Sequence, residues 1–123
     1  MSVVGGRTVL GVVVTVVLAS TAACGADGPR TALERGEAIY GANCAQCHGA
    51  ELAGTERGPS LLDPIYGPAQ LTDAEFADSI RNGVEQRLWE FGDMPANGAI
   101  TDEQIDAILT FVRVRQAGGV PGA

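Results

Sequence analysis

The chain has 123 residues, with 15 acidic side chains, eight arginines, no lysine and a formal net charge of −7. This length is typical of one domain. An acidic chain without lysine excludes nucleic acid as an expected partner. The same balance favours basic partners where charge selects them.

Residues 1–23 have the pattern of an export signal. Arg7 supplies a positive charge, residues 8–18 are mostly apolar, and small residues follow to Ala23. This order is typical of a signal peptide. The apolar run is shorter than the ~20 residues of a membrane-spanning helix, although an uncleaved anchor is the alternative. Cleavage would leave 100 residues that hold seven arginines and all 15 acids.

Cys24 comes directly after this segment. The sequence "TAAC" at 21–24 resembles the lipobox of bacterial lipoproteins, in which the cysteine is lipidated and becomes the mature N-terminus. That motif usually has leucine where this chain has Thr21, and cleavage without lipidation is the alternative. Because an exported lone thiol would be reactive, we expect a lipid anchor at Cys24. Residues 24–30 then form a short flexible linker.

Three helices are predicted in residues 31–117, and each begins with a capping box. These boxes are Thr31-x-x-Glu34, Thr72-x-x-Glu75 and Thr101-x-x-Gln104. The first helix should span residues 32–43, the second should end at Asn82-Gly83, and the third should end before Gly118-Gly119. Residues 49–70 are rich in glycine and proline, which predicts a loop, and residues 118–123 are predicted to be a flexible tail. The expected fold is all-α, with three main helices and long loops around one large apolar group.

The segment 44–48 holds Cys44, Cys47 and His48, which is the only histidine of the chain. Three kinds of site use such residues: a redox dithiol, half of a zinc site, and the attachment site of a c-type haem. Structural zinc needs four ligands in spaced pairs. A redox dithiol normally follows a strand of an α/β fold. The sequence supplies neither context, so covalent haem is the favoured interpretation.

In that interpretation Cys44 and Cys47 each bond the haem covalently, and His48 is the proximal iron ligand. Ligation by two histidines of one chain is excluded, since no second histidine exists. Met94 lies in the Gly/Pro-containing stretch 91–98 and is the only methionine beyond the signal. It is therefore the candidate for the second iron ligand, with core packing as the ordinary alternative. The predicted cofactor is one haem c, with His48 and Met94 as metal ligands.

With these motifs, residues 31–115 closely resemble the class I c-type cytochrome family, in particular its small bacterial monohaem members. Gly36 and Tyr40 stand before Cys44 as the family's glycine and aromatic do, which implies a close crossing of the first and last helices at the Ile108/Phe111 face. "RGPSL" at 57–61 resembles a family loop in which the proline carbonyl accepts the second ring N–H of the haem histidine. The resemblance implies this role for Pro59, and "Met-Pro" at 94–95 matches the family's distal ligand.

The resemblance implies an exported, monomeric electron carrier, not an enzyme, that passes single electrons between redox protein partners. We expect it in the periplasm or at the outer face of the cytoplasmic membrane. The alternatives are the cytochrome subunit of a periplasmic dehydrogenase, a small haem peroxidase, and a gas or redox sensor. Trp89 could pack on the haem, bond a propionate or serve the core. Arg81 and Arg87 could pair with propionates or stay solvated.

Overall fold

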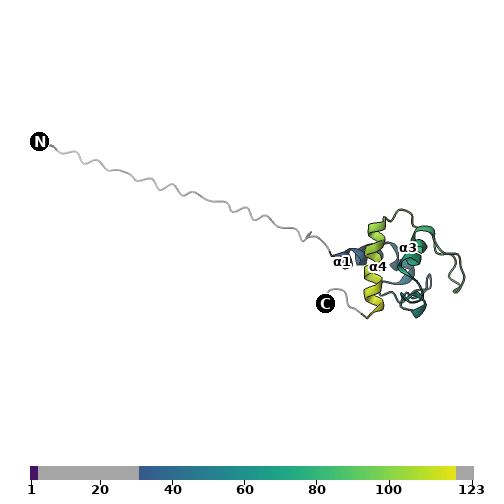
Figure 1. Cartoon of the computed structure of the whole chain (residues 1–123). Coiled ribbons are helices and arrows are strands. Elements are labelled where there is room, and N and C mark those ends of the chain that lie inside the picture. Colours follow the sequence, from purple (N-terminus) through teal and green to yellow (C-terminus); the bar gives the residue numbers. More distant parts are fainter. Residues whose placement is uncertain (3–30, 119–123) are drawn as a thin grey trace.

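The computed structural model describes residues 1–2 and 31–118. The signal interpretation of residues 3–23, the linker at 24–30 with Cys24, and the tail at 119–123 lie outside these residues. The described elements are helices α1 (Ala32–Asn43), α2 (Ala45–His48), α3 (Asp73–Asn82) and α4 (Asp102–Gln116), with a 3₁₀ helix η1 (Pro64–Tyr66) (Figure 1). The all-α fold with three main helices is confirmed, and the two short helical elements were not predicted.

Each main helix begins at the residue that the capping boxes predicted. The hydroxyls of Thr31, Thr72 and Thr101 accept hydrogen bonds from the backbone N–H three residues later, at 3.2, 3.3 and 3.3 Å. The Glu or Gln side chain at that third position accepts from the cap N–H at 2.8, 2.8 and 2.9 Å. Each cap satisfies backbone donors that the helix leaves free and stabilises its helix by about 1 kcal/mol.

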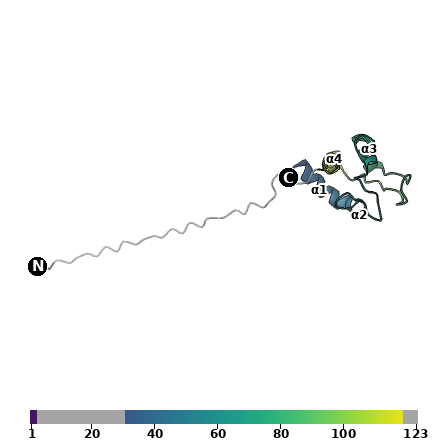
Figure 2. The ribbon, with the colours of Figure 1, turned by 90° about the horizontal axis from the view of Figure 1, so that it is seen from below.

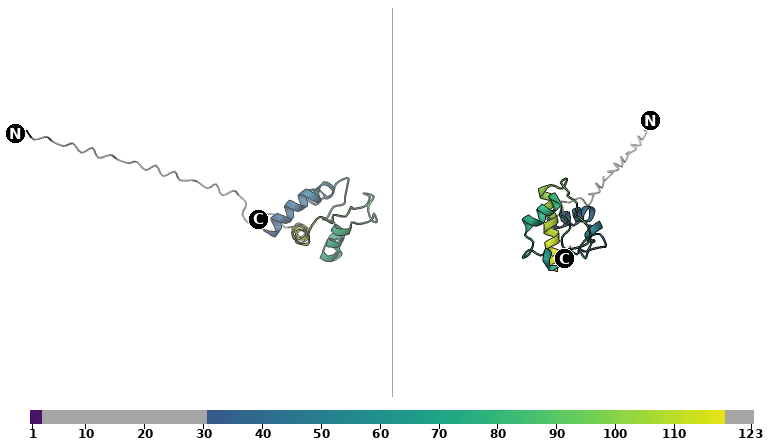
Figure 3. Two further views of the ribbon diagram at one scale, coloured as in Figure 1. Left: turned by 90° about the horizontal axis from the view of Figure 1, so that it is seen from above. Right: turned by 90° about the vertical axis from the view of Figure 1, so that its right-hand side faces the viewer.

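Helices α1 and α4 cross in close contact, and the left view of Figure 3 shows α4 end-on beside α1. Gly36 makes the crossing possible: a Cβ placed on it would lie 1.9 Å from the carbonyl oxygen of Ala107 and 3.0 Å from the Cβ of Phe111. One turn later, the rings of Tyr40 and Phe111 pack with centroids 5.2 Å apart. The predicted contact is therefore confirmed at Phe111, whereas Gly36 itself meets Ala107.

The hydrophobic core lies between α4 and the elements that pack on it. Figure 2 shows α4 end-on between α1 and α3. Helix α4 contributes six of the 13 buried apolar side chains of the described residues, more than any other element, and Ile105, Ile108, Phe111 and Val112 are among them. Leu52, from the loop after α2, is also fully buried. The core is thus one apolar cluster to which α4 is the largest contributor.

Arg113 of α4 fixes the loop that runs from η1 to α3. Its guanidinium donates to the carbonyl oxygens of Tyr66 and Leu71, both at 2.7 Å, and to the Asp73 carboxylate at 2.8 Å. Its side chain is only 16% exposed. Side-chain contacts of this kind hold the loop in place, since residues 31–118 form isolated β-bridges but no strand that could pair with it. Within the same residues, none of the helices is long and apolar enough to cross a membrane.

Candidate functional site

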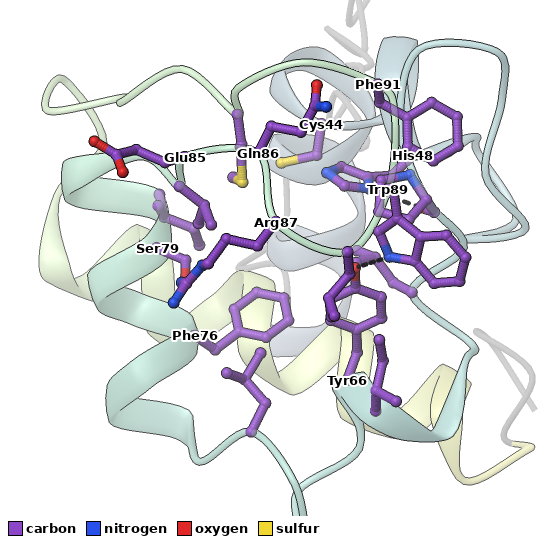
Figure 4. Close-up of a pocket in the computed structure, with 18 of the residues that line it drawn as sticks. Cys44, His48, Tyr66, Phe76, Ser79, Glu85, Gln86, Arg87, Trp89 and Phe91 are labelled. Atoms are coloured by element: carbon purple, nitrogen blue, oxygen red, sulfur yellow. Dashed lines mark hydrogen bonds between the residues drawn. The ribbon is translucent and has the colours of Figure 1, made fainter.

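A cavity of about 400 Å³ opens between α3, α4 and the loops, and Figure 4 shows its lining. This volume lies in the range of small-molecule and cofactor sites. Most of the lining side chains are apolar, among them Leu61, Phe76, Ile80, Val84 and Ile108. Four of the five predicted site residues also line it, namely Cys44, His48, Pro59 and Met94.

Helix α2 brings two of these residues into the cavity. Cys44 ends α1 and caps α2, and the backbone N–H of His48 donates to the carbonyl oxygen of Cys44 at 2.9 Å. Residues four apart in a helical turn share a face, so both side chains reach the same space. Cys47 does not line the cavity. Its carbonyl oxygen accepts a hydrogen bond from the Thr55 hydroxyl at 2.6 Å.

The imidazole of His48 is oriented by the loop that follows α2. Its Nδ1 lies 2.9 Å from the carbonyl oxygen of Pro59, a distance at which Nδ1–H donates a hydrogen bond. This is the contact that the family resemblance implied. A donor bond from Nδ1 fixes the ring and its tautomer and leaves Nε2 to bind a metal. The backbone of Gly58 packs so closely on Cys47 that an added Cβ would lie 2.9 Å from the Cys47 carbonyl oxygen.

The environment of Cys44 does not suit a redox thiol. Burial, followed by the nearby charge of Cys47, raises the pKa of the Cys44 thiol to about 11. Redox dithiols react as thiolates and depend on a lowered pKa. This shift opposes the dithiol interpretation, whereas a thiol that ends in a thioether has no such requirement.

The loop between α3 and α4 places Met94 at the cavity. The backbone N–H of Met94 donates to the Val84 carbonyl oxygen at 2.8 Å, and the Val84 N–H donates to the Met94 carbonyl oxygen at 3.0 Å. Gly83 has a φ of 75°, and a Cβ there would lie 2.5 Å from the Met94 carbonyl oxygen. Gly83 and Val84 therefore position Met94. The sequence showed Gly83 only as a helix end and gave no sign of Val84.

Two hydrogen bonds stabilise the tip of the same loop. The Gln86 N–H donates to the Asp93 carboxylate, and the Gly92 N–H donates to the Gln86 side-chain oxygen, both at 2.8 Å. Trp89 lies between these residues, lines the cavity, and donates its indole N–H to the Tyr66 hydroxyl at 2.8 Å. The only N–H of the Trp89 indole is therefore donated to Tyr66 in this structure and not to a haem propionate.

The two arginines near the site differ in their surroundings. Arg81 pairs with Asp102 at the start of α4, with an Nη2 to Oδ1 distance of 2.7 Å. Arg87 lines the cavity itself. Of the two, Arg87 is therefore the one that could pair with a carboxylate of a cofactor bound in the cavity.

The donor set and the shape of the cavity suit a haem. An imidazole nitrogen and a thioether sulfur lie among apolar walls, and this pair is a known ligand set of haem iron. Cys44 lies at the same cavity, with Cys47 three residues further along the chain. One thiol, one imidazole and one thioether thus line an apolar cavity, and the second thiol follows the first by three residues; a covalent His/Met haem requires these four groups.

Comparison with known proteins identifies the family. Residues 31–112 match the family model described as "Cytochrome C oxidase, cbb3-type, subunit III". The chain is 30% identical over 87 residues to the cbb3-type cytochrome c oxidase subunit CcoP of Cereibacter sphaeroides, covering 66% of this chain and 30% of that protein. It is 38% identical over 64 residues to cytochrome c of Chlamydomonas reinhardtii, covering 52% and 57% of the two chains.

A solved structure agrees with these relatives. The c-type cytochrome XoxG of Methylobacterium extorquens AM1 matches with a TM-score of 0.55 and 27% identity, covering 72% of this chain and 52% of that one. The chain thus spans less than two thirds of the length of each of these three proteins. Its fold, its cavity and these matches agree that the chain belongs to the class I c-type cytochromes, the family whose cofactor is covalently attached haem c.

Proposed function

We propose that this protein carries single electrons between redox proteins through one haem c. Cys44 and Cys47 would hold the haem by thioether bonds, and His48 and Met94 would bind its iron. The observation that carries the proposal is that His48 and Met94, 46 positions apart in the chain, line one apolar cavity together with Cys44. The haem supplies a metal that gains and loses one electron.

The surrounding residues keep the two ligands in place. The Pro59 carbonyl accepts from His48 Nδ1 and directs Nε2 to the metal. The paired backbone bonds of Val84 and Met94 hold the thioether at the cavity. An iron held by both His48 and Met94 would keep no open position for a substrate, so the arrangement suits an electron carrier. A peroxidase or a gas sensor would need Met94 to leave.

Spectra of variant holoproteins test this assignment. The haem should stay on the denatured chain through acid–acetone extraction, and His48→Ala should prevent stable holoprotein. Met94→Ala should lose the methionine–iron charge-transfer band of the ferric near-infrared spectrum and should bind added imidazole. Haem that extracts freely would contradict covalent attachment. A Met94→Ala spectrum identical to the wild type would contradict the axial assignment.

A role as the electron-transfer module of a larger complex is the second candidate. It is favoured by the relatives named as oxidase subunits, of which the chain covers about a third. A periplasmic dehydrogenase complex would use the same chemistry. Purification from membranes and periplasm under mild conditions, followed by sizing, separates the two functions: a free carrier elutes alone as a monomer, and a subunit elutes with its enzyme.

Residues 1–23 are, in this proposal, an export signal, and Cys24 is the lipidated N-terminus of the mature protein. The linker 24–30 then joins the lipid to the cytochrome domain at 31–117, and 118–123 is a tail. Cys24→Ser should release the protein from membranes, because the acyl chains hold it there. A wild-type protein that is soluble and begins at a residue other than Cys24 would contradict the anchor.

A further inference from the structure

One buried leucine has a backbone conformation that leucine rarely adopts. Leu52 has a φ of 61°, and among the residues that the structure describes it is the one non-glycine residue with a positive φ. Its side chain is completely buried. Such a conformation costs free energy, persists only where the surrounding structure holds it, and is found most often near functional sites. The contacts of Leu52 therefore indicate what its conformation serves.

The carbonyl oxygen of Leu52 accepts two hydrogen bonds from the residues that follow Pro59. The Ser60 hydroxyl donates to it at 3.1 Å, and the Leu61 N–H donates to it at 2.8 Å. The same hydroxyl accepts a hydrogen bond from the Leu62 N–H at 3.2 Å. Ser60 is thus held through its hydroxyl by an earlier part of the loop and by the residues that come after it.

Ser60 shares a peptide plane with the carbonyl group that orients His48. The Pro59 carbonyl and the Ser60 N–H belong to one planar peptide. The oxygen of this carbonyl lies 2.9 Å from His48 Nδ1. The proline ring fixes φ of Pro59, so the direction of the carbonyl depends on how the peptide plane itself is turned. The bonds of the Ser60 hydroxyl fix the residue at the end of that plane.

The backbone of Gly54 packs against the same peptide. A Cβ placed on Gly54 would lie 2.7 Å from the Ser60 nitrogen and 3.0 Å from the Pro59 carbonyl carbon. The Gly54 N–H also donates to the carbonyl oxygen of His48 at 2.8 Å, so the loop returns to the residue that it orients. The contacts with Gly54 and Leu52 leave the peptide between Pro59 and Ser60 little freedom to turn.

We propose that Ser60 is a positioning residue for His48: its hydroxyl holds the Pro59 carbonyl in line with Nδ1 and thereby tunes the reduction potential. This inference rests on the proposed function and adds a residue that adjusts it. A hydrogen bond from Nδ1 to a carbonyl makes the imidazole a stronger electron donor, which stabilises ferric over ferrous iron. Ser60 does not line the haem cavity, so it acts only through Pro59.

Local stability alone is the ordinary role of such a serine. Its bonds to Leu52 and Leu62 would stabilise the loop whether or not His48 depends on them. The two roles differ in what the loss of the hydroxyl changes. A stabilising serine affects the melting temperature, whereas a positioning serine also affects the Nδ1–H of His48 and the reduction potential.

The test compares variants of the purified full-length holoprotein. Ser60→Ala removes the hydroxyl, and the loop should still fold because the Leu52 oxygen keeps its bond from the Leu61 N–H. Ser60→Gly removes the same hydroxyl and is the second variant, and Ser60→Thr keeps a hydroxyl at this position. The matched control is Thr110→Val, which deletes an exposed hydroxyl of α4 that donates to the Asp106 carbonyl oxygen at 2.9 Å.

Proton NMR of the ferrous protein gives the hydrogen-exchange rate of the His48 Nδ1–H, and voltammetry gives the reduction potential. In Ser60→Ala and Ser60→Gly this proton should exchange about two- to tenfold faster, because a hydrogen bond that holds its acceptor is lost. The potential should rise, with the one-electron equilibrium shifted about threefold toward the ferrous form. Ser60→Thr and Thr110→Val should keep the wild-type exchange rate and potential.

A lower melting temperature in Ser60→Ala with wild-type exchange and potential would overturn the inference, since Ser60 would then serve stability alone. A potential that falls would also overturn it. So would a Ser60→Thr variant that behaves like Ser60→Ala, or an equal change in Thr110→Val.

The same samples separate this inference from the proposed function. A wild type that carries no covalent haem, or shows no reversible one-electron wave, contradicts the electron-carrier proposal. Normal spectra and waves in every variant, combined with unchanged exchange at His48 and an unchanged potential, contradict the role of Ser60 alone.

Discussion

Substitution of Gly36 by alanine should weaken the fold at the crossing of α1 and α4. The added Cβ would lie 1.9 Å from the Ala107 carbonyl oxygen, whereas ordinary contacts begin at 3.4 Å, so the helices must separate by about 1.5 Å. Overpacking of this kind costs about 1–3 kcal/mol and sometimes more. Alanine returns about 1 kcal/mol through its higher helix propensity. Because the two nearest atoms, the carbonyl oxygen and carbon of Ala107, belong to the α4 backbone, which cannot rotate away, we expect the upper end of that cost and a net loss of about 2 kcal/mol.

Gly41→Ala is the matched control, since Gly41 lies in the same helix and has no heavy atom within 4 Å of an added Cβ. It should stabilise the protein by about 0.5–1 kcal/mol. Urea unfolding and thermal melts of the holoproteins, followed by far-ultraviolet circular dichroism, measure both variants. A loss of this size lowers the melting temperature by roughly 8–16 °C. Equal midpoints for Gly36→Ala and Gly41→Ala would refute the argument from close backbone contact.

Three further changes have defined outcomes. Gly83→Ala puts a Cβ 2.5 Å from the Met94 carbonyl oxygen at a φ that L residues rarely adopt; it should cost about 1–3 kcal/mol in urea melts and weaken the near-infrared methionine band. Arg113→Lys should cost about 2 kcal/mol in the same melts, because one ammonium cannot replace the fork that reaches Tyr66, Leu71 and Asp73. The methionine band should persist to high pH in a titration, since the chain has no lysine to displace Met94; a nitrogen-ligated ferric EPR signal near neutral pH would contradict this.

The helices were predictable because their signals are local. A threonine and the Glu or Gln three residues later mark each start, and Asn82-Gly83 marks the end of α3. These residues act on their own turn of backbone, so neighbours in sequence are sufficient to place them. Helix α2 was not predicted, because its four residues are too few to show a helical period.

The walls of the site were less predictable, because their contacts join distant segments. Arg113 reaches carbonyl oxygens 42 and 47 positions earlier in the chain. Trp89 bonds a hydroxyl 23 positions earlier. The single bridge between Val84 and Met94 has no alternating pattern, since one pair of residues does not make a strand. Only the resemblance to a family pointed to Pro59 as the partner of His48.

Stability and site geometry are coupled in this domain through Tyr40. Its ring is 1% exposed, packs on Phe111 at the helix crossing, and also lines the cavity. Its hydroxyl donates to the carbonyl oxygen of Gly49 at 2.7 Å, directly after His48. A shift of α1 against α4 therefore moves the end of the segment that carries the imidazole. The Gly36→Ala variant should accordingly perturb the hydrogen bond between His48 and Pro59, and with it the reduction potential, as well as the melting temperature. Gly41→Ala should leave the hydrogen bond and the reduction potential unchanged.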